Sequence, residues 1–210
     1  MLRFFVAGSG PGIGKTVVSA ILTNLVNGAY WKPIECGAED GFDTETMFQL
    51  LNPKKYPIYP SVYSLQKPFS PHHAARLENI TIQLNQFILP ATTKPLIIET
   101  AGGLLTPLTA SLTNLDLFQS WEGLWIIVSR HYLGSINHTL LTVEALKYRK
   151  LSVLGIIFNG DHNPDSEEAI LKISKLPLLG RLYPEKTIHK NIINLYVKRW
   201  KKQIIPLLHN

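Results

Sequence analysis

The chain has 210 residues, of which 45% are hydrophobic and 17% charged, and its formal net charge is +6. This length and composition suit one globular domain with a substantial core and exclude a disordered protein. The single cysteine, Cys36, excludes an internal disulfide framework. We expect a cytoplasmic protein, because residues 1–7 leave no room for a signal peptide and no apolar run approaches the roughly 20 residues that cross a bilayer.

Short apolar runs alternate with helical patterns along the chain. In chain order, strands are expected at residues 4–7, 29–32, 96–99, 124–129, 153–158 and 178–182. Helices are expected at residues 16–26, 42–51 and 135–149 and near the C-terminus, and residues 52–71 form a long proline-rich connection. Strands separated by helix-length segments indicate an α/β fold with one doubly wound, mostly parallel sheet covered on both faces.

The first expected strand runs into a glycine-rich loop, Gly8-Ser9-Gly10-Pro11-Gly12-Ile13-Gly14-Lys15-Thr16, here called the phosphate loop. A strand that stops in glycines and restarts as a helix presents several backbone N–H groups to one point, and Lys15 adds a full positive charge. A polyphosphate is the expected ligand, with the Thr16 hydroxyl placed to bind its Mg²⁺. A plain structural turn is the alternative. We predict a P-loop NTPase-like architecture in a single ATP-binding domain over residues 1–210.

Four polar loops follow expected strands and should meet beyond the carboxyl ends of the sheet: residues 8–16, 32–43, 99–107 and 130–138. Glu99 ends a buried strand, where an acid beside the phosphate loop holds Mg²⁺ or else caps a turn. Asp40 and Asp43 precede a helix, and Asp43 is either a second Mg²⁺ ligand or an ordinary helix-start residue. Lys32 either points a second cation at the phosphates or is a surface lysine.

Three further features are interpreted as structural. The pair His72-His73 lies in the proline-rich connection without further metal ligands, which favours a helix start over a metal site. Cys36 has no evident partner that would make it a nucleophile. The basic group near the C-terminus is interpreted as the solvated face of a packed helix, and not as a nucleic-acid or membrane surface; its members are Lys198, Arg199, Lys201 and Lys202.

Four segments of the chain resemble dethiobiotin synthetases, the ATP-dependent carboxylases of biotin synthesis. They are YWKPIECG (30–37), FSPHHAARLE (69–78), IETAGGLLTPL (98–108) and YLGSINHTLLTVEAL (132–146). The five residues between Gly8 and Gly14, one more than in the common phosphate-binding pattern, also match that family. The resemblance runs in order through nearly the whole chain, and the segments 98–108 and 132–142 are its specific part.

The resemblance implies a homodimer that converts 7,8-diaminononanoate, CO₂ and Mg-ATP into dethiobiotin, through a carbamate and a carbamic-phosphoric anhydride. It implies that Lys15 and Lys32 are catalytic and that Thr16, Asp43 and Glu99 hold Mg²⁺. The implied nucleotide contacts are Gly12, Ile13, Gly14, Lys15, Thr16, Val17, Asn159, Pro177, Leu178 and Leu179. The implied substrate contacts are Pro11, Lys32, Cys36, Gly102, Gly134, Ser135, Ile136 and Asn137, the last four forming a helix start that receives the substrate carboxylate from the partner subunit.

The chain departs from the family pattern within the phosphate loop. Pro11 and Gly12 stand where the family usually has Thr and Glu, and proline offers no N–H group. A related ATPase with another substrate is therefore an alternative, although cobyrinate-diamide synthases carry an extra glutamine-hydrolysing domain that 210 residues cannot hold. A nucleotide-driven switch of the partition type is a second alternative, but Ser9-Gly10-Pro11 lacks the early lysine typical of that class.

Overall fold

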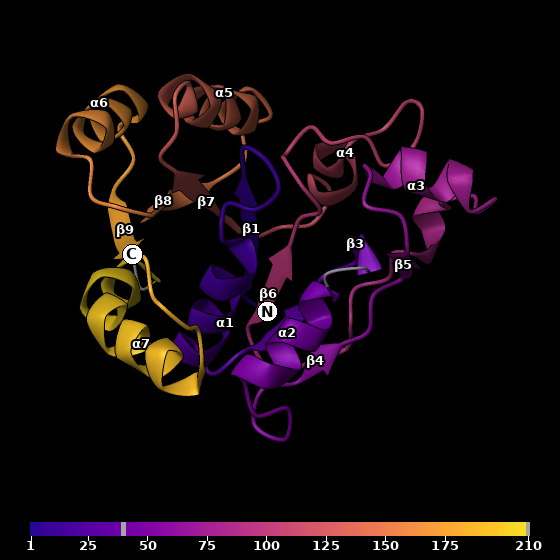
Figure 1. Ribbon diagram of the computed structural model, residues 1–210, viewed down its shortest axis with the longest axis horizontal. Helices are drawn as coiled ribbons and strands as arrows, with labels where there is room; N and C mark the ends of the chain where they lie inside the picture. Colours follow the sequence, from indigo (N-terminus) through magenta and orange to yellow (C-terminus); the bar gives the residue numbers. More distant parts are fainter. Residues whose placement is uncertain (39–40, 209–210) are drawn as a thin grey trace.

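A seven-stranded sheet runs through the middle of the molecule in a computed structural model that describes residues 1–38 and 41–208 (Figure 1). Each strand pairs in parallel with its neighbours. Because all strands run the same way, their carboxyl ends share one edge of the sheet. The order across the sheet is β4 (Ile58–Tyr59), β2 (Ala29–Trp31), β6 (Leu96–Glu99), β1 (Arg3–Gly8), β7 (Leu124–Arg130), β8 (Val153–Asn159) and β9 (Leu178–Leu182).

The central strand β1 shows why the sheet is covered on both faces. Its residues Phe4 and Val6 belong to one core cluster, whereas Phe5 and Ala7 belong to the other, and all four are at most 1% exposed. Successive side chains of a strand point to opposite faces, so a continuous apolar run needs a hydrophobic layer on each side.

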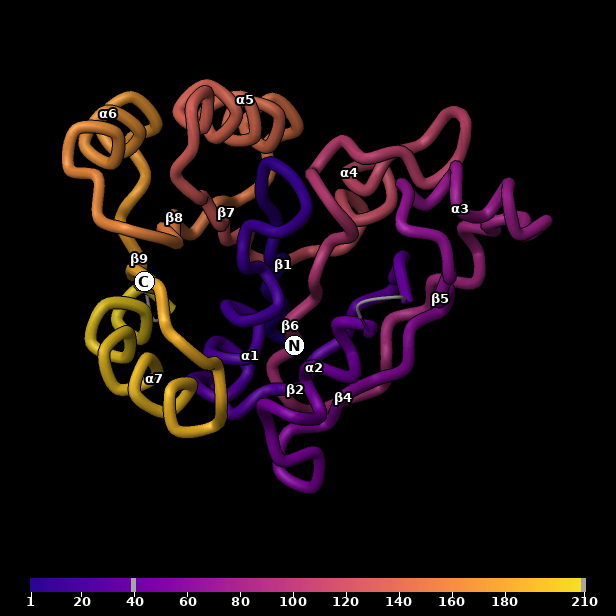
Figure 2. Tube along the Cα trace, viewed as in Figure 1, coloured from indigo at the N-terminus to yellow at the C-terminus, as the bar shows by residue number. Residues whose placement is uncertain are grey.

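Helices supply both layers (Figure 2). One face is covered by α1 (Lys15–Leu25), α2 (Asp43–Leu50) and α7 (Lys190–Ile204). The other face is covered by α4 (Asn114–Phe118), α5 (Ser135–Tyr148) and α6 (Pro164–Ser174). A second, two-stranded sheet of β3 (Ile34–Cys36) and β5 (Tyr63–Leu65) packs against α3 (Pro71–Leu77). Short 3₁₀ turns lie at Leu84–Gln86 and Ile205–Leu208.

The predicted doubly wound parallel sheet is confirmed, and its six expected strands all form with shifts of one residue at most at either end. The proline-rich connection differs from the expectation, because it also contributes β4 to the edge of the main sheet and β5 to the small sheet. The helix start expected at His72-His73 is confirmed by α3. In α7 the four basic residues are exposed while Ile193, Tyr196 and Trp200 are buried. Within residues 1–38 and 41–208, no helix has the length and apolar character to span a membrane.

Candidate active site

The phosphate loop leaves β1 at the carboxyl edge of the sheet and enters α1. Gly12 and Gly14 have φ values of +65° and +93°, a region that side chains rarely adopt. A Cβ on Gly14 would also lie 2.4 Å from Nδ2 of Asn159, which donates a hydrogen bond of 2.8 Å to the Ile13 carbonyl. Gly14 is the N-cap of α1 and has no side chain, so the first N–H groups of the helix remain available to an anion.

Two cations contact the backbone of the phosphate loop. Lys15 is 5% exposed, and its Nζ donates a hydrogen bond of 2.7 Å to the Gly10 carbonyl. Burial, together with the nearby Lys32 ammonium, lowers the pKa of Lys15 to about 8. Arg130, at the carboxyl end of β7, donates from Nη1 to the Gly12 carbonyl over 3.0 Å. Both charges therefore lie against the phosphate loop.

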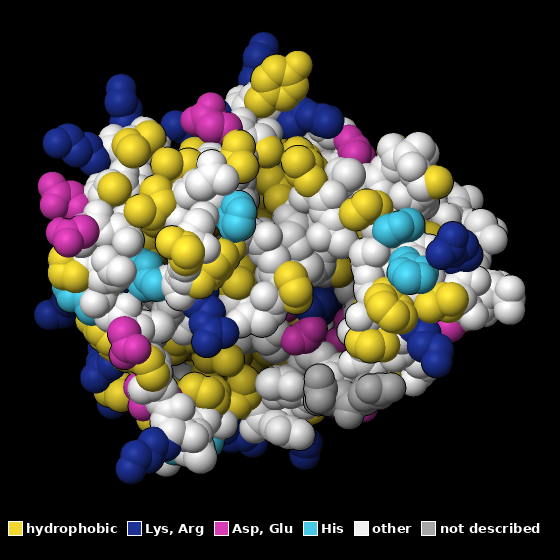
Figure 3. All heavy atoms as spheres, turned by 45° about the horizontal axis from the view of Figure 1, so that its top comes forward, with side chains coloured by type: hydrophobic (Ala, Val, Ile, Leu, Met, Phe, Trp, Pro, Cys, Tyr) yellow, Lys and Arg dark blue, Asp and Glu magenta, His cyan; other side chains and the backbone are white. Residues whose placement is uncertain are grey.

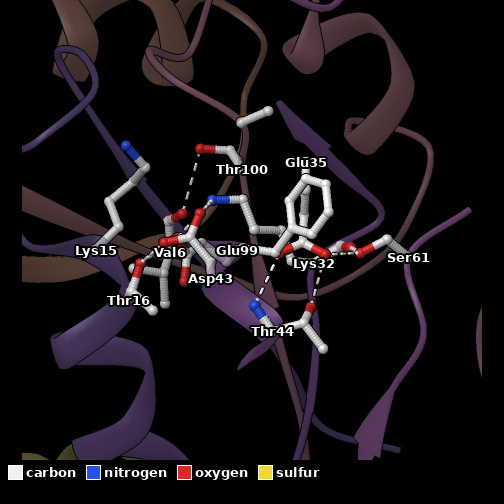
Figure 4. Close-up of polar contacts among 12 residues, drawn as sticks. Val6, Lys15, Thr16, Lys32, Glu35, Asp43, Thr44, Ser61, Glu99 and Thr100 are labelled. Atoms are coloured by element: carbon white, nitrogen blue, oxygen red, sulfur yellow. Dashed lines mark hydrogen bonds and ion pairs between the residues drawn. The ribbon is translucent and has the colours of Figure 1, made fainter. Parts of the chain in front are cut away.

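Beside the phosphate loop, the side chains of Thr16, Lys32, Asp43 and Glu99 meet in what we call the carboxylate cluster (Figure 4). The Thr16 hydroxyl contacts Asp43 Oδ1 and lies 3.0 Å from Glu99 Oε1. The Lys32 ammonium contacts both carboxylates, at 3.0 Å in the case of Glu99 Oε1. Each residue reaches this point from the end of a different element: α1, β2, α2 and β6.

Charge pairing outweighs burial in setting the pKa values of Lys32 and Asp43 in the carboxylate cluster. Burial by itself lowers the pKa of Lys32, but the carboxylates of Glu99 and Asp43 outweigh it and hold that pKa above its usual value. Burial likewise raises the pKa of Asp43, and the Lys32 charge with hydrogen bonds from Lys32 and Thr16 brings it below its usual value. Tyr30 donates to Glu99 Oε2 over 3.1 Å, and burial raises the pKa of its phenol well above the usual range.

The carboxylate cluster fits Mg²⁺ by the chemistry of its donors. Two carboxylates and a hydroxyl are the hard oxygen ligands that Mg²⁺ prefers, and the Lys32 contact shows that both carboxylates converge on a single cation. In the part of the chain that the structure describes, no group of three or more His, Cys, Asp or Glu residues has a metal-binding arrangement. Phosphate oxygens and water would therefore have to complete the coordination, as is usual for Mg²⁺ bound with a nucleotide. Asp40 lies outside the described residues.

A cavity of about 360 Å³ opens beside the phosphate loop, on a face where hydrophobic side chains gather around a hollow (Figure 3). It is lined by Ser9, by residues 103–106 and by four residues of α5: His138, Leu141, Thr142 and Ala145. The loop of residues 99–107 approaches closely, since a Cβ on Gly103 would lie 3.0 Å from the Ser9 carbonyl oxygen. Tyr132 connects the phosphate loop with α5 at this cavity, because its OH lies 3.2 Å from Ser9 Oγ and 2.9 Å from His138 Nδ1.

Six of the eight predicted substrate contacts fall into two groups, whereas Lys32 lies in the carboxylate cluster and Cys36 ends β3. Pro11 and Gly102 lie on the phosphate loop and the 99–107 loop, which line this cavity through other residues, and Gly102 adopts a φ of +67°. Gly134, Ser135, Ile136 and Asn137 line a separate cavity at the start of α5, where Gly134 is the N-cap with a left-handed φ of 97°. One copy of the chain therefore presents the two groups at different places.

Cys36 ends β3 and is half-buried. Burial raises the pKa of its thiol to about 12. The thiol is therefore protonated at neutral pH, which supports the interpretation that Cys36 is not a nucleophile, because the thiolate is the reactive form.

Contacts of Pro177, Leu178 and Leu179 with the nucleotide base stay a prediction, and the strand register gives them no support. The register pairs Ile156 with Leu178 and Asn159 with Leu182, so these three residues lie at the amino end of β9, before the part of that strand that is level with Asn159. Leu179 is fully buried in the core.

The residues that follow β9 lie at the carboxyl edge of the sheet, next to the end of β8. Gly160 donates a hydrogen bond of 2.9 Å to the Leu182 carbonyl, and Pro184 lines a cavity of about 260 Å³ with Arg130 and residues 160–163. Pro177, Leu178 and Leu179 were assigned from the family resemblance alone, whereas ligands bind after the strands in such sheets.

Sequence reasoning also missed three polar residues of this region. Arg130 carried a usable signal, because it ends a buried strand just as Lys32 follows one. Tyr30 and Glu35 carried no such signal. Each lies within a short apolar segment, and its hydrogen-bond partner comes from another segment of the chain: Glu99 for Tyr30 and Thr44 for Glu35.

Comparison with known proteins agrees with this geometry. The family model described as an AAA domain matches residues 3–191. The ATP-dependent dethiobiotin synthetase BioD of Chlamydia pneumoniae is 44% identical over 96% of this chain and 90% of its own length. That of Christiangramia forsetii is 42% identical over 97% of this chain and 98% of its own length.

Solved structures with the same fold are more distant in sequence. A ParA family ATPase from Chlorobium tepidum is 13% identical with a TM-score of 0.55, covering 100% of this chain and 99% of its own. The septum site-determining protein MinD of Pyrococcus horikoshii, complexed with Mg-ADP, is 16% identical with a TM-score of 0.56, covering 98% of this chain and 93% of its own. These likenesses show the P-loop ATPase fold alone. Sequence identity above 40% along nearly the whole chain places it in a narrower group: it belongs to the family of ATP-dependent dethiobiotin synthetases.

Proposed function

We propose that this chain is a cytoplasmic ATP- and Mg²⁺-dependent cyclo-ligase of biotin biosynthesis, which carboxylates 7,8-diaminononanoate with CO₂ and closes the ring of dethiobiotin. We assign the activity to a single ATP-binding domain over residues 1–210. The observation that carries the proposal is the carboxylate cluster, which lies between the phosphate loop and a loop that lines a substrate-sized cavity, in a member of this family.

The chemistry needs a site that stabilises negative charge in two steps. One substrate amine takes up CO₂ as a carbamate, and a carbamate oxygen attacks the γ-phosphorus of ATP, with ADP as the leaving group. The second amine then attacks the carbonyl carbon of the mixed anhydride, and phosphate leaves as the ring closes. Lys15 and Lys32 stabilise the charge that moves onto the phosphoryl oxygens. Thr16, Asp43 and Glu99 would hold Mg²⁺, which would neutralise charge at the phosphates.

The remaining nucleotide contacts come from the phosphate loop and β8. Backbone N–H groups of Gly12, Ile13 and Gly14 and of the first turn of α1, including Val17, face the phosphates. Asn159 has one amide hydrogen on the Ile13 carbonyl at 2.8 Å, which leaves its oxygen and second hydrogen for the base. Pro11, Gly102 and Cys36 contact the substrate from the surrounding loops.

The substrate site is completed by a second copy of the chain. The helix start at Gly134–Asn137 suits a carboxylate, yet it lies apart from the cavity beside the phosphate loop. Several apolar side chains on this face are exposed: Leu133 by 103%, Leu141 by 59% and Leu105 by 56%. We infer a homodimer in which these side chains are covered and the helix start of one copy receives the carboxylate of the substrate bound by the other.

Leu133→Asp is expected to convert the dimer to a monomer and to lower dethiobiotin formation at least tenfold, because a charge would be buried in an apolar interface. Sedimentation analysis at micromolar concentration and the product assay measure the two effects. Ile88→Asp is the matched control. Ile88 is another exposed apolar residue, with 75% of its surface accessible, but it lies in a loop distant in sequence from α5. A wild-type chain that sediments as a monomer while fully active would contradict the dimer.

The decisive experiment is a product assay by mass spectrometry. Purified protein is expected to release phosphate from ATP only when diaminononanoate, Mg²⁺ and bicarbonate are all present, with one dethiobiotin formed per phosphate. Omitting each component in turn is the control. Phosphate release that ignores diaminononanoate, without dethiobiotin, would overturn the proposal and favour a related ATPase with another substrate or a nucleotide-driven switch.

A further inference from the structure

Glu35 is a buried charged residue that the proposed reaction does not use. It lies in the middle of β3, is 2% exposed, and lies beside the carboxylate cluster, next to Thr44 and Ser61 (Figure 4). Its carboxylate accepts hydrogen bonds from Thr44 N and Thr44 Oγ1, each at 2.8 Å, and a further one from Ser61 Oγ. Burying a carboxylate costs free energy unless such partners compensate it, so three donors around one acid indicate a built arrangement.

Both partners of Glu35 connect directly to the carboxylate cluster. Thr44 follows Asp43 in the first turn of α2, so fixing the backbone of Thr44 fixes the position from which Asp43 extends. The Ser61 hydroxyl also lies 2.7 Å from the carbonyl oxygen of Lys32, so its one proton lies between two acceptors, Glu35 Oε1 and this carbonyl. Glu35 is thus connected to two members of the carboxylate cluster through one intermediate residue each: to Asp43 through Thr44, and to Lys32 through Ser61.

Helix capping alone does not account for a buried acid at this place. The exposed Glu45 already accepts a hydrogen bond of 3.2 Å from the N–H of Phe42, the N-cap of α2. That contact serves the same helix end at the surface, where no charge has to be buried. The additional, buried contacts of Glu35 are with Thr44, which follows Asp43 in the chain, and with Ser61, which contacts the Lys32 carbonyl.

We propose that Glu35 is a positioning residue that holds Asp43 and Lys32 in place for the bound metal and nucleotide. The proposal rests on the Mg²⁺ role of Asp43 in the proposed function. Residues that orient metal ligands typically change metal affinity or activity by about 10- to 100-fold when removed. Glutamine can replace Glu35 in this role, because its carbonyl accepts from Thr44 N and its amide donates to hydroxyls that rotate to accept. Alanine leaves the same donors without a partner.

The experiment measures the Kd of the non-hydrolysable analogue AMP-PNP by calorimetry, once with Mg²⁺ and once with EDTA. The ratio of the two Kd values reports how much the metal tightens nucleotide binding, and it needs no turnover. We expect Glu35→Ala to reduce this ratio about tenfold or more, and Glu35→Gln to stay within about threefold of the wild-type ratio. Thr44→Val, which removes the hydroxyl donor alone, is expected to reduce the ratio by a smaller factor.

Glu45→Ala is the matched control, since it removes a glutamate from the same end of α2 and is expected to leave the ratio unchanged. A folded Glu35→Ala with the wild-type ratio would overturn the proposal, and so would a Glu35→Gln as impaired as Glu35→Ala. If Glu35→Ala does not fold, Thr44→Val decides: an unchanged ratio contradicts the positioning role. A wild-type protein that forms no dethiobiotin would overturn the proposed function, whereas these binding ratios would still test Glu35.

Discussion

Lys15→Ala is expected to lower the rate of dethiobiotin formation about 10³-fold at saturating ATP. The Lys15 ammonium is buried against the phosphate loop, and the reaction moves negative charge onto phosphoryl oxygens at this point. A preorganised cation acts strongly there because water is largely excluded. The rate is measured by mass spectrometry of dethiobiotin under single-turnover conditions.

Lys94→Ala is the matched control for Lys15→Ala. The Lys94 ammonium also donates to a backbone carbonyl, that of Lys55, over 2.9 Å, but it lies at the opposite end of the sheet from the phosphate loop. Its removal is expected to change stability slightly and to leave the rate unchanged. A Lys15→Ala variant that retains more than a tenth of the wild-type rate would contradict the assigned role of Lys15.

Glu99→Gln is expected to lower both activity and stability. Activity should fall about 100-fold, because a neutral amide is a poor Mg²⁺ ligand and the metal would be held by Asp43 and Thr16 alone. The free energy of unfolding should fall by about 1–3 kcal/mol, because the buried Lys32 ammonium keeps only one of its two carboxylates. Product formation and urea unfolding measure the two effects separately.

Glu168→Gln serves as the control for Glu99→Gln, because Glu168 is an exposed glutamate of α6. It loses the same charge without loss of a buried partner, and neither measured quantity should change by more than the experimental error. Unimpaired product formation by Glu99→Gln would remove Glu99 from the metal site. Unchanged stability would contradict the pairing of its carboxylate with Lys32.

Six strands of the main sheet were predictable because they are apolar and flanked by helical patterns. Buried parallel strands such as β1 and β8 need apolar side chains on both faces, so their consecutive residues are apolar and can be recognised in the sequence. The strands β3, β4 and β5 were not predictable in the same way. They have two or three residues each and lie among prolines, so they carry no periodicity, and their pairing depends on segments distant in sequence.

The same distinction divides the candidate site. Lys15 and Thr16 follow from a local motif, and Glu99 and Lys32 follow from the rule that polar residues after buried strands meet at one edge. Pro177–Leu179 came from the family resemblance and not from this rule, and only the β8–β9 register shows which end of β9 is level with Asn159.

By itself, the sequence determined the phosphate loop, the parallel sheet and the family, since each depends on residues close together in the chain or on their order. The tertiary structure alone decided that the Lys32 ammonium lies between Asp43 and Glu99, that Arg130 contacts Gly12, and that Glu35 supports the start of α2. These contacts join residues from different strands and helices. Their geometry is determined by how the elements pack, because hydrogen bonds and ion pairs depend on distances that no local pattern encodes.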